Sequence, residues 1–202
     1  DITALRYLAG EIDTLLILAP SGVHSQWNTE QIPEHMTEDV EYETFSMNAS
    51  RRHKGDDTFR ACLRTSKLAV FSLNVESLVS DIGRKTILEI LERRKNVFIV
   101  MDESTRIKNP KSATSKFAHK IADRCKFKAI LNGSPVSKGA EDLWSQYSFL
   151  SKSILGSNFY AFRNKYCIMG GWEQRQIIGH RNLEELQNIL DRYSSRVRKE
   201  DC

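Results

Sequence analysis

Residues 97–105 have the sequence VFIVMDEST, in which a run of apolar residues is followed at once by Asp102 and Glu103. The run scarcely alternates in polarity, which is typical of a parallel strand that is covered on both faces. Similar runs occur at residues 14–19 (TLLILA), 68–73 (LAVFSL) and 128–131 (KAIL). Residues 40–45 (VEYETF) do alternate, and predict a strand near the edge of the sheet.

Helical patterns separate these strands, at residues 2–12, 21–36, 82–94, 113–125 and 140–150. In the first, Ile2, Leu5, Leu8 and Ile12 share one face, which is expected to point inward. Pro33 is expected to end or kink the second. Strands that alternate with helices predict an α/β fold with one doubly wound, mostly parallel sheet and right-handed crossovers.

The pattern changes after residue 150. Residues 172–180 (WEQRQIIGH) predict a small hairpin or an ordered loop, and residues 182–194 predict an amphipathic helix capped by Asn182. We expect residues 1–150 to form the sheet domain and residues 151–202 to form a helical extension of that same domain.

Composition sets the broad class. The chain has 202 residues, of which 40% are hydrophobic and 28% charged, so it can form one packed domain and is not typical of a disordered protein. The net charge of +4 does not by itself indicate a nucleic-acid partner. No apolar run is long enough to span a membrane, so no membrane association is expected.

The cysteines are Cys62, Cys125, Cys167 and Cys202. None forms a C-x-x-C pair or has a histidine at metal-ligand spacing, which argues against a zinc site and against a disulfide framework. Unpaired cysteines are typical of a reducing compartment, so a cytoplasmic, non-secreted protein is expected.

Two histidines and three aromatic residues carry no clear signal of a site. His119 and His180 have no partner at a suitable spacing and are expected at the surface or in helix packing. Trp144, Tyr147 and Phe149 recur at helical spacing and are expected in the core.

Polar turns follow three of the predicted strands, at the strand ends where open parallel sheets bind ligands. Asp102 and Glu103 could hold a metal ion and orient a water molecule. Residues 132–135 (NGSP) and 19–22 (APSG) could bind a phosphate or form an ordinary turn and helix cap. Taken singly, each turn is explained at least as well by the ordinary structural role.

Taken in order, these segments resemble the first RecA-like lobe of superfamily-two helicases, and more narrowly the Swi/Snf-type DNA-dependent ATPases. The family's acidic box matches residues 102–105 (DEST), its basic I-K-N segment matches residues 107–109, and its threonine-glycine-threonine-proline turn appears as NGSP. Its asparagine-tyrosine-glutamate segment is similar to residues 74–76 (NVE), and its alanine-proline segment ending in tryptophan to residues 19–27. Residues 141–145 (EDLWS) and 155–159 (LGSNF) also match, so the resemblance covers nearly the whole chain.

The resemblance implies a RecA-like three-layer α/β/α fold and a protein that hydrolyses Mg-ATP to move along double-stranded DNA. Asp102 would hold the magnesium ion, and Glu103 would polarise the attacking water. Asn132, Gly133 and Ser134 would lie at the nucleotide and couple it to the DNA. The residues along the DNA track, which is contacted mostly through the phosphate backbone, would be Pro20, Ser21, His24, Trp27, Asn74, Glu76 and Ser77.

The sequence also departs from the family's pattern. Thr105 stands where the acidic box usually ends in histidine, and Asn132 where the turn usually begins with threonine; we interpret both as marks of a divergent branch, because Asp102 and Glu103 are intact. The phosphate-binding G-x-G-K-T loop does not occur, and residues 196–202 (RVRKEDC) correspond to the link to the family's second RecA-like lobe. The chain is therefore expected to be a truncated first lobe that is inactive alone, with that second lobe as its partner.

Basic residues are unevenly distributed. Residues 104–128 contain one acid, Asp123, and eight basic residues, namely Arg106, Lys108, Lys111, Lys116, Lys120, Arg124, Lys126 and Lys128. A DNA-binding surface and a solvated helix face explain them equally well, and on the first interpretation Arg106 and Lys108 contact DNA. Residues 51–54 (RRHK) favour a flexible loop, with DNA contact as the alternative.

The function predicted by the resemblance is thus the ATPase lobe of a Swi/Snf-type translocase, of small prokaryotic or phage type. Two alternatives stay open. One is a degenerate lobe that only docks DNA or protein, which the missing lysine loop favours. The other is the motor subunit of a restriction enzyme, which shares the superfamily-two lobe.

Overall fold

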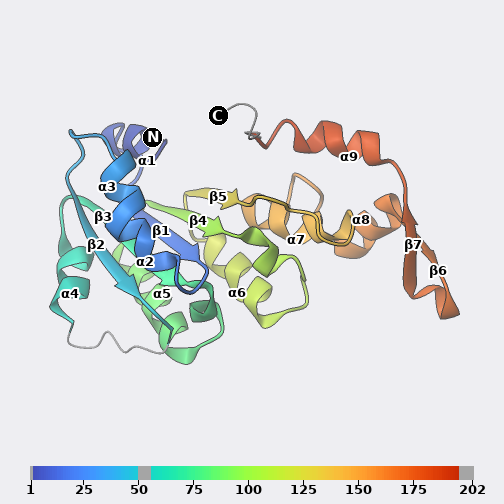
Figure 1. Cartoon of the computed structure of the whole chain (residues 1–202), viewed down its shortest axis with the longest axis horizontal. Helices are drawn as coiled ribbons and strands as arrows, with labels where there is room; N and C mark the ends of the chain where they lie inside the picture. The colour runs from blue at the N-terminus through green and yellow to red at the C-terminus, as the bar shows by residue number, and fades with distance from the viewer. Residues whose placement is uncertain (1, 50–55, 196–202) are drawn as a thin grey trace.

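The computed structural model describes residues 2–49 and 56–195 (Figure 1). Its central sheet is parallel, with strands in the order β2-β3-β1-β4-β5. The strands are β1 (Thr14–Ala19), β2 (Tyr42–Met47), β3 (Leu68–Asn74), β4 (Val97–Asp102) and β5 (Phe127–Leu131). Every strand expected in the sheet is confirmed to within two residues, and β2 lies at an edge as expected.

Helices cover both faces of the sheet (Figure 1). One face carries α1 (Ile2–Leu8) and a continuous helical run of α2 (His24–Gln26), η1 (Trp27–Gln31) and α3 (Ile32–His35). The other carries α4 (Asp57–Arg64), α5 (Asp81–Arg93) and α6 (Ala113–Ala122). The expected three-layer α/β/α architecture is therefore confirmed.

The inner strands β1, β3 and β4 do not alternate in polarity because each one serves two hydrophobic cores. In β1, Leu16 and Leu18 belong to the core under α4, α5 and α6, whereas Leu15 and Ile17 belong to the core under α1 and α3. Successive side chains of a strand point to opposite faces, so a strand covered on both sides must be apolar throughout.

A third hydrophobic cluster holds the end of the chain. It joins α7 (Glu141–Leu150) to α8 (Phe159–Tyr166) and α9 (Leu183–Leu190), so the boundary expected at residue 150 falls inside one cluster. Trp144 and Tyr147 are buried there, and Phe149 is buried in the core under α6, as expected. Between α8 and α9, β6 (Cys167–Gly170) and β7 (Gln176–His180) form an antiparallel hairpin with η4 (Trp172–Gln174) at its turn.

Pro33 disturbs the helical run of α2, η1 and α3 without ending it. The turn before it, η1, is a π turn in which the backbone N–H of Ile32 donates to Trp27 O. This wider turn makes room for the proline ring against the preceding carbonyls. Pro33 then stands near the start of α3, where its missing N–H costs little, and the run ends at His35.

The face of α1 expected to point inward is exposed, so that prediction is wrong. Ile2, Leu5 and Leu8 are 61%, 67% and 53% exposed, and Ala4 is buried in their place. The helix ends at Leu8, before Gly10 adopts a φ of +68°, so Ile12 lies beyond it and is buried separately.

Asn182 does not cap α9, also against expectation. It adopts a left-handed conformation, and its side-chain amide donates to Lys165 O at 2.8 Å instead. Among the described cysteines, Cys62, Cys125 and Cys167 are free, and Cys202 lies outside the described residues. Within residues 2–49 and 56–195, no helix has the length and apolar character needed to cross a bilayer.

Candidate nucleotide and DNA site

The carboxyl ends of the strands form the edge of the sheet where the predicted site residues gather. The chain leaves β1 toward one side of the sheet and leaves β4 toward the other, so the strand order reverses between them. In open parallel sheets, ligands bind in the crevice outside such a reversal. The loops after β1, β3, β4 and β5 all open at this edge.

Asp102 is the last residue of β4 and is half-buried. Its Oδ2 accepts a hydrogen bond from Trp27 Nε1 at 3.1 Å, and its Oδ1 accepts one from the backbone N–H of Glu103 at 3.0 Å. Glu103 is exposed and left-handed, with φ 53° and ψ 58°. Such a conformation costs a residue with a side chain about 1 kcal/mol or more, and strain of this kind is common at functional sites.

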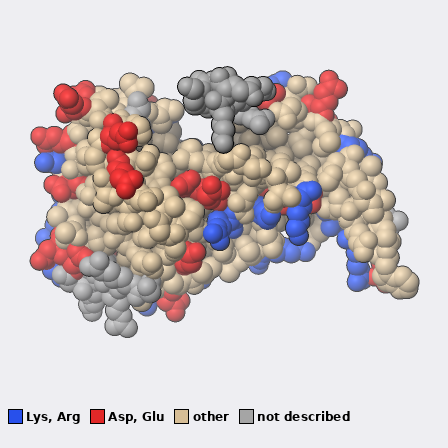
Figure 2. Space-filling view, viewed as in Figure 1, with Lys and Arg blue, Asp and Glu red and all other residues tan. Residues whose placement is uncertain are grey.

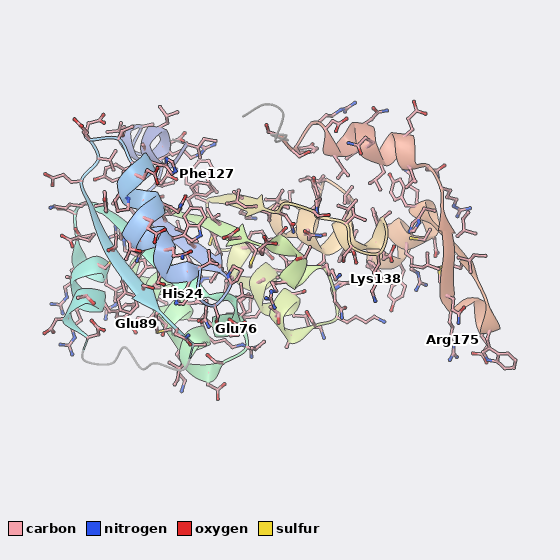
Figure 3. The ribbon with its side chains drawn as sticks, in the orientation of Figure 1. His24, Glu76, Glu89, Phe127, Lys138 and Arg175 are labelled. Atoms are coloured by element: carbon pink, nitrogen blue, oxygen red, sulfur yellow. The ribbon has the colours of Figure 1, made fainter. Side chains whose placement is uncertain are left out.

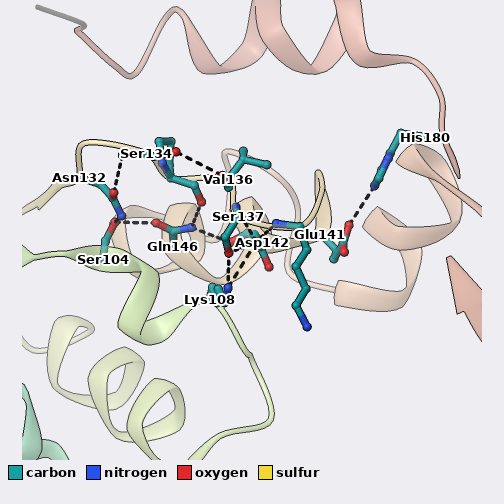
Figure 4. A network of polar contacts seen from close by, with 12 residues as sticks. Ser104, Lys108, Asn132, Ser134, Val136, Ser137, Glu141, Asp142, Gln146 and His180 are labelled. Atoms are coloured by element: carbon teal, nitrogen blue, oxygen red, sulfur yellow. Dashed lines mark hydrogen bonds and ion pairs between the residues drawn. The ribbon is translucent and has the colours of Figure 1, made fainter. Parts of the chain in front are cut away.

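Buried polar side chains connect the acidic box to the turn after β5 (Figure 4). Ser104 donates to Gln146 Oε1 at 2.6 Å and accepts from Asn132 Nδ2 at 3.3 Å. Gln146 in turn donates to Pro135 O at 2.7 Å, and the backbone N–H of Ser134 donates to Asn132 Oδ1 at 2.8 Å. These hydrogen bonds connect the end of β4 to the turn after β5.

Asp142 lies in the first turn of α7 and fixes the last part of the turn that follows β5 (Figure 4). Its Oδ2 accepts from the backbone N–H groups of Ser137 and Lys138, both at 2.9 Å, and from Ser137 Oγ at 2.8 Å; Lys108 Nζ lies 3.7 Å away. Burial alone would raise the pKa of Asp142, but these hydrogen bonds and Lys108 outweigh it and lower the pKa.

A cavity of about 590 Å³ opens between the acidic box and this turn. Its lining residues are Glu103, Thr105, Lys108, Asn132, Gly133, Ser134, Val136 and Ser137. The structure thus brings Glu103 together with the three turn residues that the sequence assigned to the nucleotide. Sequence reasoning missed Gln146 and the role of Asp142. The available signal was that an acid and an amide stand in the first turns of a helix that follows a turn containing glycines.

A second polar cluster occupies the ends of β1 and β3. Ser21 Oγ donates to Glu76 Oε2 at 3.0 Å and accepts from Asn74 Nδ2 at 3.0 Å. Asn74 Oδ1 accepts from Ser77 Oγ at 2.9 Å and from the backbone N–H of Ala49 at 2.7 Å. Figure 3 shows Glu76 and His24 near each other at this edge, with Phe127 at the opposite end of the sheet.

Three residues expected to line the DNA track are buried, which corrects that expectation. His24, Asn74 and Ser77 are 7%, 2% and 0% exposed, so their side chains cannot reach a phosphate in this conformation. Burial also lowers the pKa of His24, although the Pro20 carbonyl and Glu76 act in the opposite direction. These residues can position the loops, whereas Ser21 and Glu76 are exposed and Pro20 and Trp27 are partly so.

Trp27 connects the helical run after β1 to the end of β4. Its helical run follows the β1 loop, and its indole N–H reaches the Asp102 carboxylate across the crevice. The residue that the sequence placed on the DNA track therefore contacts the residue that it placed at the metal.

The basic residues of 104–128 do not form one surface. Arg106 is exposed beside the acidic box, and Lys108 lines the cavity and contacts Asp142 and Ser137. Lys126 lies at the opposite edge, where its backbone N–H donates to Val97 O and its Nζ to Glu11 O. On the face in Figure 2, basic side chains are concentrated over the half from β4 to the hairpin, and acidic ones over the half with α3 and β2.

Two segments with predicted roles lie outside the described residues. They are residues 51–54 (RRHK) and residues 196–202 (RVRKEDC). His119, expected at the surface or in helix packing, lies between α6 and α7, with its Nε2 2.9 Å from Ser145 O. His180, for which the same was expected, has its Nε2 3.0 Å from Glu141 Oε2.

The donors at the sheet edge fit a magnesium ion better than a softer metal. Asp102 offers a half-buried carboxylate with Glu103 beside it, and oxygen donors that leave room for water are the ligands that Mg²⁺ prefers. The open cavity next to Glu103 has the polar lining expected for a phosphorylated ligand.

Known proteins with related sequences and folds were found by comparison. The model of the SNF2-related domain matches residues 3–202. An ISWI chromatin-remodeling complex ATPase of Saccharomyces cerevisiae is 26% identical over 98% of this chain, which covers 16% of that protein. The SWI/SNF-related matrix-associated actin-dependent regulator of chromatin subfamily A-like protein 1 of Drosophila melanogaster is 33% identical over 50% of this chain, which covers 13% of it.

A solved structure agrees with these matches. The Sulfolobus solfataricus SWI2/SNF2 ATPase core in complex with double-stranded DNA superposes with a TM-score of 0.64 at 22% identity, over 97% of this chain and 36% of that one. The fold is therefore RecA-like, as the resemblance implied. The chain spans less than a fifth of the two curated relatives' lengths. It belongs to the SNF2-related domain family, as a Swi/Snf-type first RecA-like lobe.

Proposed function

We propose that this chain is the first motor lobe of an ATP-dependent translocase that acts on double-stranded DNA. The observation that carries the proposal is the hydrogen bond from Trp27, in the helical run after β1, to Asp102 at the end of β4, across the strand-order reversal. A motor needs such a link, because the state of the nucleotide must alter the grip on DNA. The relatives are described as chromatin-remodeling or regulatory proteins, and the similar solved core is bound to duplex DNA, which supports the proposal.

On the nucleotide side, Asp102 would hold magnesium, directly or through water. The ion would offset the charge that develops on the phosphates during transfer. Glu103 is exposed at the cavity and would orient the attacking water and accept its proton. Asn132, Gly133 and Ser134 would face the phosphates, with Asn132 fixed by Ser104.

On the DNA side, the exposed loops after β1 and β3 would follow the phosphate backbone. Pro20 and Ser21 would contact it, and Arg106 would add positive charge. Glu76 carries the wrong charge for a phosphate contact, so its role would be to hold Ser21.

The sequence has no G-x-G-K-T loop, so ATP hydrolysis is proposed for the complete protein that contains this lobe. That protein would supply the lysine loop and the second lobe with its arginine. The 202 residues would supply the metal-binding carboxylate and the catalytic carboxylate.

The proposal is tested by ATPase assays of the complete protein without DNA, with single-stranded DNA and with duplex DNA. We expect duplex DNA to stimulate hydrolysis most strongly. Equal stimulation by single strands would contradict the preference for duplex. Duplex binding without hydrolysis under any condition would replace the proposal with a docking role.

A further inference from the structure

A cysteine, a histidine and a glutamate meet where the hairpin joins α7. Cys167 is the first residue of β6, His180 is the last of β7, and Glu141 is the first of α7. Cys167 and His180 are paired across the hairpin, and directly paired residues of two antiparallel strands point to the same face. The Cys167 Sγ, a His180 ring nitrogen and a Glu141 carboxylate oxygen all lie within 4.8 Å of one another.

We propose that Glu141, Cys167 and His180 form a binding site for a zinc-like divalent ion that fastens the hairpin to α7. This site lies outside the proposed nucleotide site and does not depend on it. In the part of the chain that the structure describes, no other group of three such side chains converges in this way.

The distances fit tetrahedral coordination. With metal bonds of about 2.0–2.3 Å to nitrogen, oxygen and sulfur, neighbouring ligand atoms lie about 3.3–3.6 Å apart. His180 Nε2 and Glu141 Oε2 are already 3.0 Å apart and face each other in Figure 4. The sulfur lies within 4.8 Å of the other two atoms, so it needs a shift of no more than about 1.5 Å, and the fourth position is left for water.

The donor types select the metal. A thiolate and an imidazole favour zinc and other borderline ions, whereas magnesium and calcium prefer oxygen donors. The ionised cysteine and glutamate together would neutralise the charge of a divalent ion, which suits a place where Cys167 is 1% exposed. Burial and Glu141 raise the pKa of the Cys167 thiol, so a metal would have to displace its proton.

Gly139 supports a built site. A Cβ on Gly139 would lie 2.3 Å from His180 Nε2 and 2.5 Å from Glu141 Oε2. Since the φ of Gly139 is not among the positive values, its backbone does not require glycine; the glycine instead leaves the space in which the two side-chain ends meet. Any larger residue would wedge between them.

The position of the site gives it a structural consequence. Glu141 is next to Asp142, which holds the Ser137 and Lys138 amides of the turn that lines the cavity. A metal at Glu141 would therefore tie the hairpin, through the start of α7, to that turn.

The spacing of Cys167 and His180 in the sequence gave no metal signal, and the absence of a zinc site was the expectation from it. Strand pairing, which spacing does not reveal, brings the two residues together. The proposal therefore reverses that expectation.

The test is cobalt and zinc titration of the untagged chain after chelator treatment. We expect Co²⁺ to give the intense absorption of a tetrahedral cobalt–thiolate centre, and Zn²⁺ to displace it. Cys167→Ser should abolish the thiolate band, and His180→Gln should weaken zinc binding by about tenfold or more. The matched controls, Cys125→Ser and His119→Gln, change a buried thiol and a packed histidine away from the cluster and should bind as the unaltered chain does.

Circular dichroism checks that each variant is folded, and native mass spectrometry of the unaltered chain gives a second measurement if Cys167→Ser does not fold. A folded, unaltered chain with neither a thiolate band nor a zinc adduct would overturn the proposal, leaving a His180–Glu141 ion pair beside an inert thiol. A thiolate band that survives in Cys167→Ser would overturn it too.

Discussion

Among single residues, Asp102 is held at both of its oxygens, by the Trp27 indole and by the backbone of Glu103. A carboxylate fixed in this way is oriented before any ligand arrives. Removing a group that orients a metal ligand typically weakens metal binding by about 10- to 100-fold.

Trp27→Phe should therefore raise the magnesium concentration needed for ATP hydrolysis by the complete protein, by about tenfold. Phenylalanine keeps most of the ring contacts and removes the N–H donor. Trp172→Phe is the matched control, because Trp172 is 80% exposed on the hairpin. An unchanged magnesium requirement in Trp27→Phe would show that the hydrogen bond does not orient Asp102.

The lowered pKa of Asp142 makes the free energy of unfolding vary with pH in the acid range. Its pKa in the folded protein is lowered, chiefly because the Ser137 and Lys138 amides and Lys108 outweigh the effect of burial. A lowered folded pKa gives stability that is present above the unfolded pKa, near 4, and is lost as the pH falls through the folded value.

Asp142→Asn should thus reduce the free energy of unfolding at pH 7 by about 2 kcal/mol, with a difference that shrinks below about pH 4. Urea unfolding at pH 7 and pH 3 measures this. Asp191→Asn, an exposed acid after α9, is the control. A difference between Asp142→Asn and the unaltered chain that is equal at both pH values would contradict the assignment.

Between elements, α5 packs so closely against η2 (Val75–Leu78) that residue 83 has no room for a side chain. A Cβ on Gly83 would lie 2.4 Å from Ser77 Cα and 2.5 Å from Ser77 O, which are backbone atoms. Gly83 therefore lets α5 pack directly against the loop that carries Asn74 and Glu76.

Gly83→Ala should destabilise the chain by about 1–3 kcal/mol. In an open helix position the same change would stabilise the chain by about 1 kcal/mol. The sign of the change in stability therefore shows whether the contact at Gly83 is close. Gly133→Ala is the comparison, since a Cβ there meets nothing within 4 Å. Equal stability of the two variants in urea unfolding would refute the close contact.

The elements also show which parts of the fold could be predicted from the sequence alone. The inner strands were predictable because a strand that serves two cores is apolar on both faces, as in residues 15–19. The inward face of α1 was not, since apolar spacing shows that Ile2, Leu5 and Leu8 share a face but not whether another element covers it, and Ile12 lies beyond the end of the helix. Apolar spacing gave no warning of that end.

In the candidate site, too, some features could be predicted from the sequence and others could not. Asp102, Glu103 and Asn132 were predictable as polar residues directly after buried strands. The burial of His24 was not, because the short helical run around it lacks a clear amphipathic pattern. The partners of Gln146 were not predictable, since its place near the start of a helix does not show that it contacts Ser104 and Pro135.

At the scale of the whole molecule, the third hydrophobic cluster joins the sheet domain to the end of the described chain. Leu186 and Leu190 of α9 pack in the same cluster as Trp144 and Phe162. Folding of the extension should therefore be cooperative with that of the sheet.

Leu186→Ala should lower the free energy of unfolding by about 2–5 kcal/mol, since Leu186 is 3% exposed. Leu183→Ala, in the same helix at a residue 52% exposed, should change it by less than about 0.5 kcal/mol. Urea denaturation followed by circular dichroism compares them. A separate early transition in the unaltered chain would show that α9 unfolds independently.

The central claim is that Glu103 activates water for ATP hydrolysis in a DNA-stimulated motor. The most direct measurement compares ATP binding and single-turnover hydrolysis, with duplex DNA, for the complete protein and its Glu103→Gln variant. Glu92→Gln, an exposed acid on α5, is the control. We predict that Glu103→Gln binds ATP and DNA but loses hydrolysis by at least about 100-fold. Hydrolysis within a few-fold of the unaltered protein would contradict the role of Glu103.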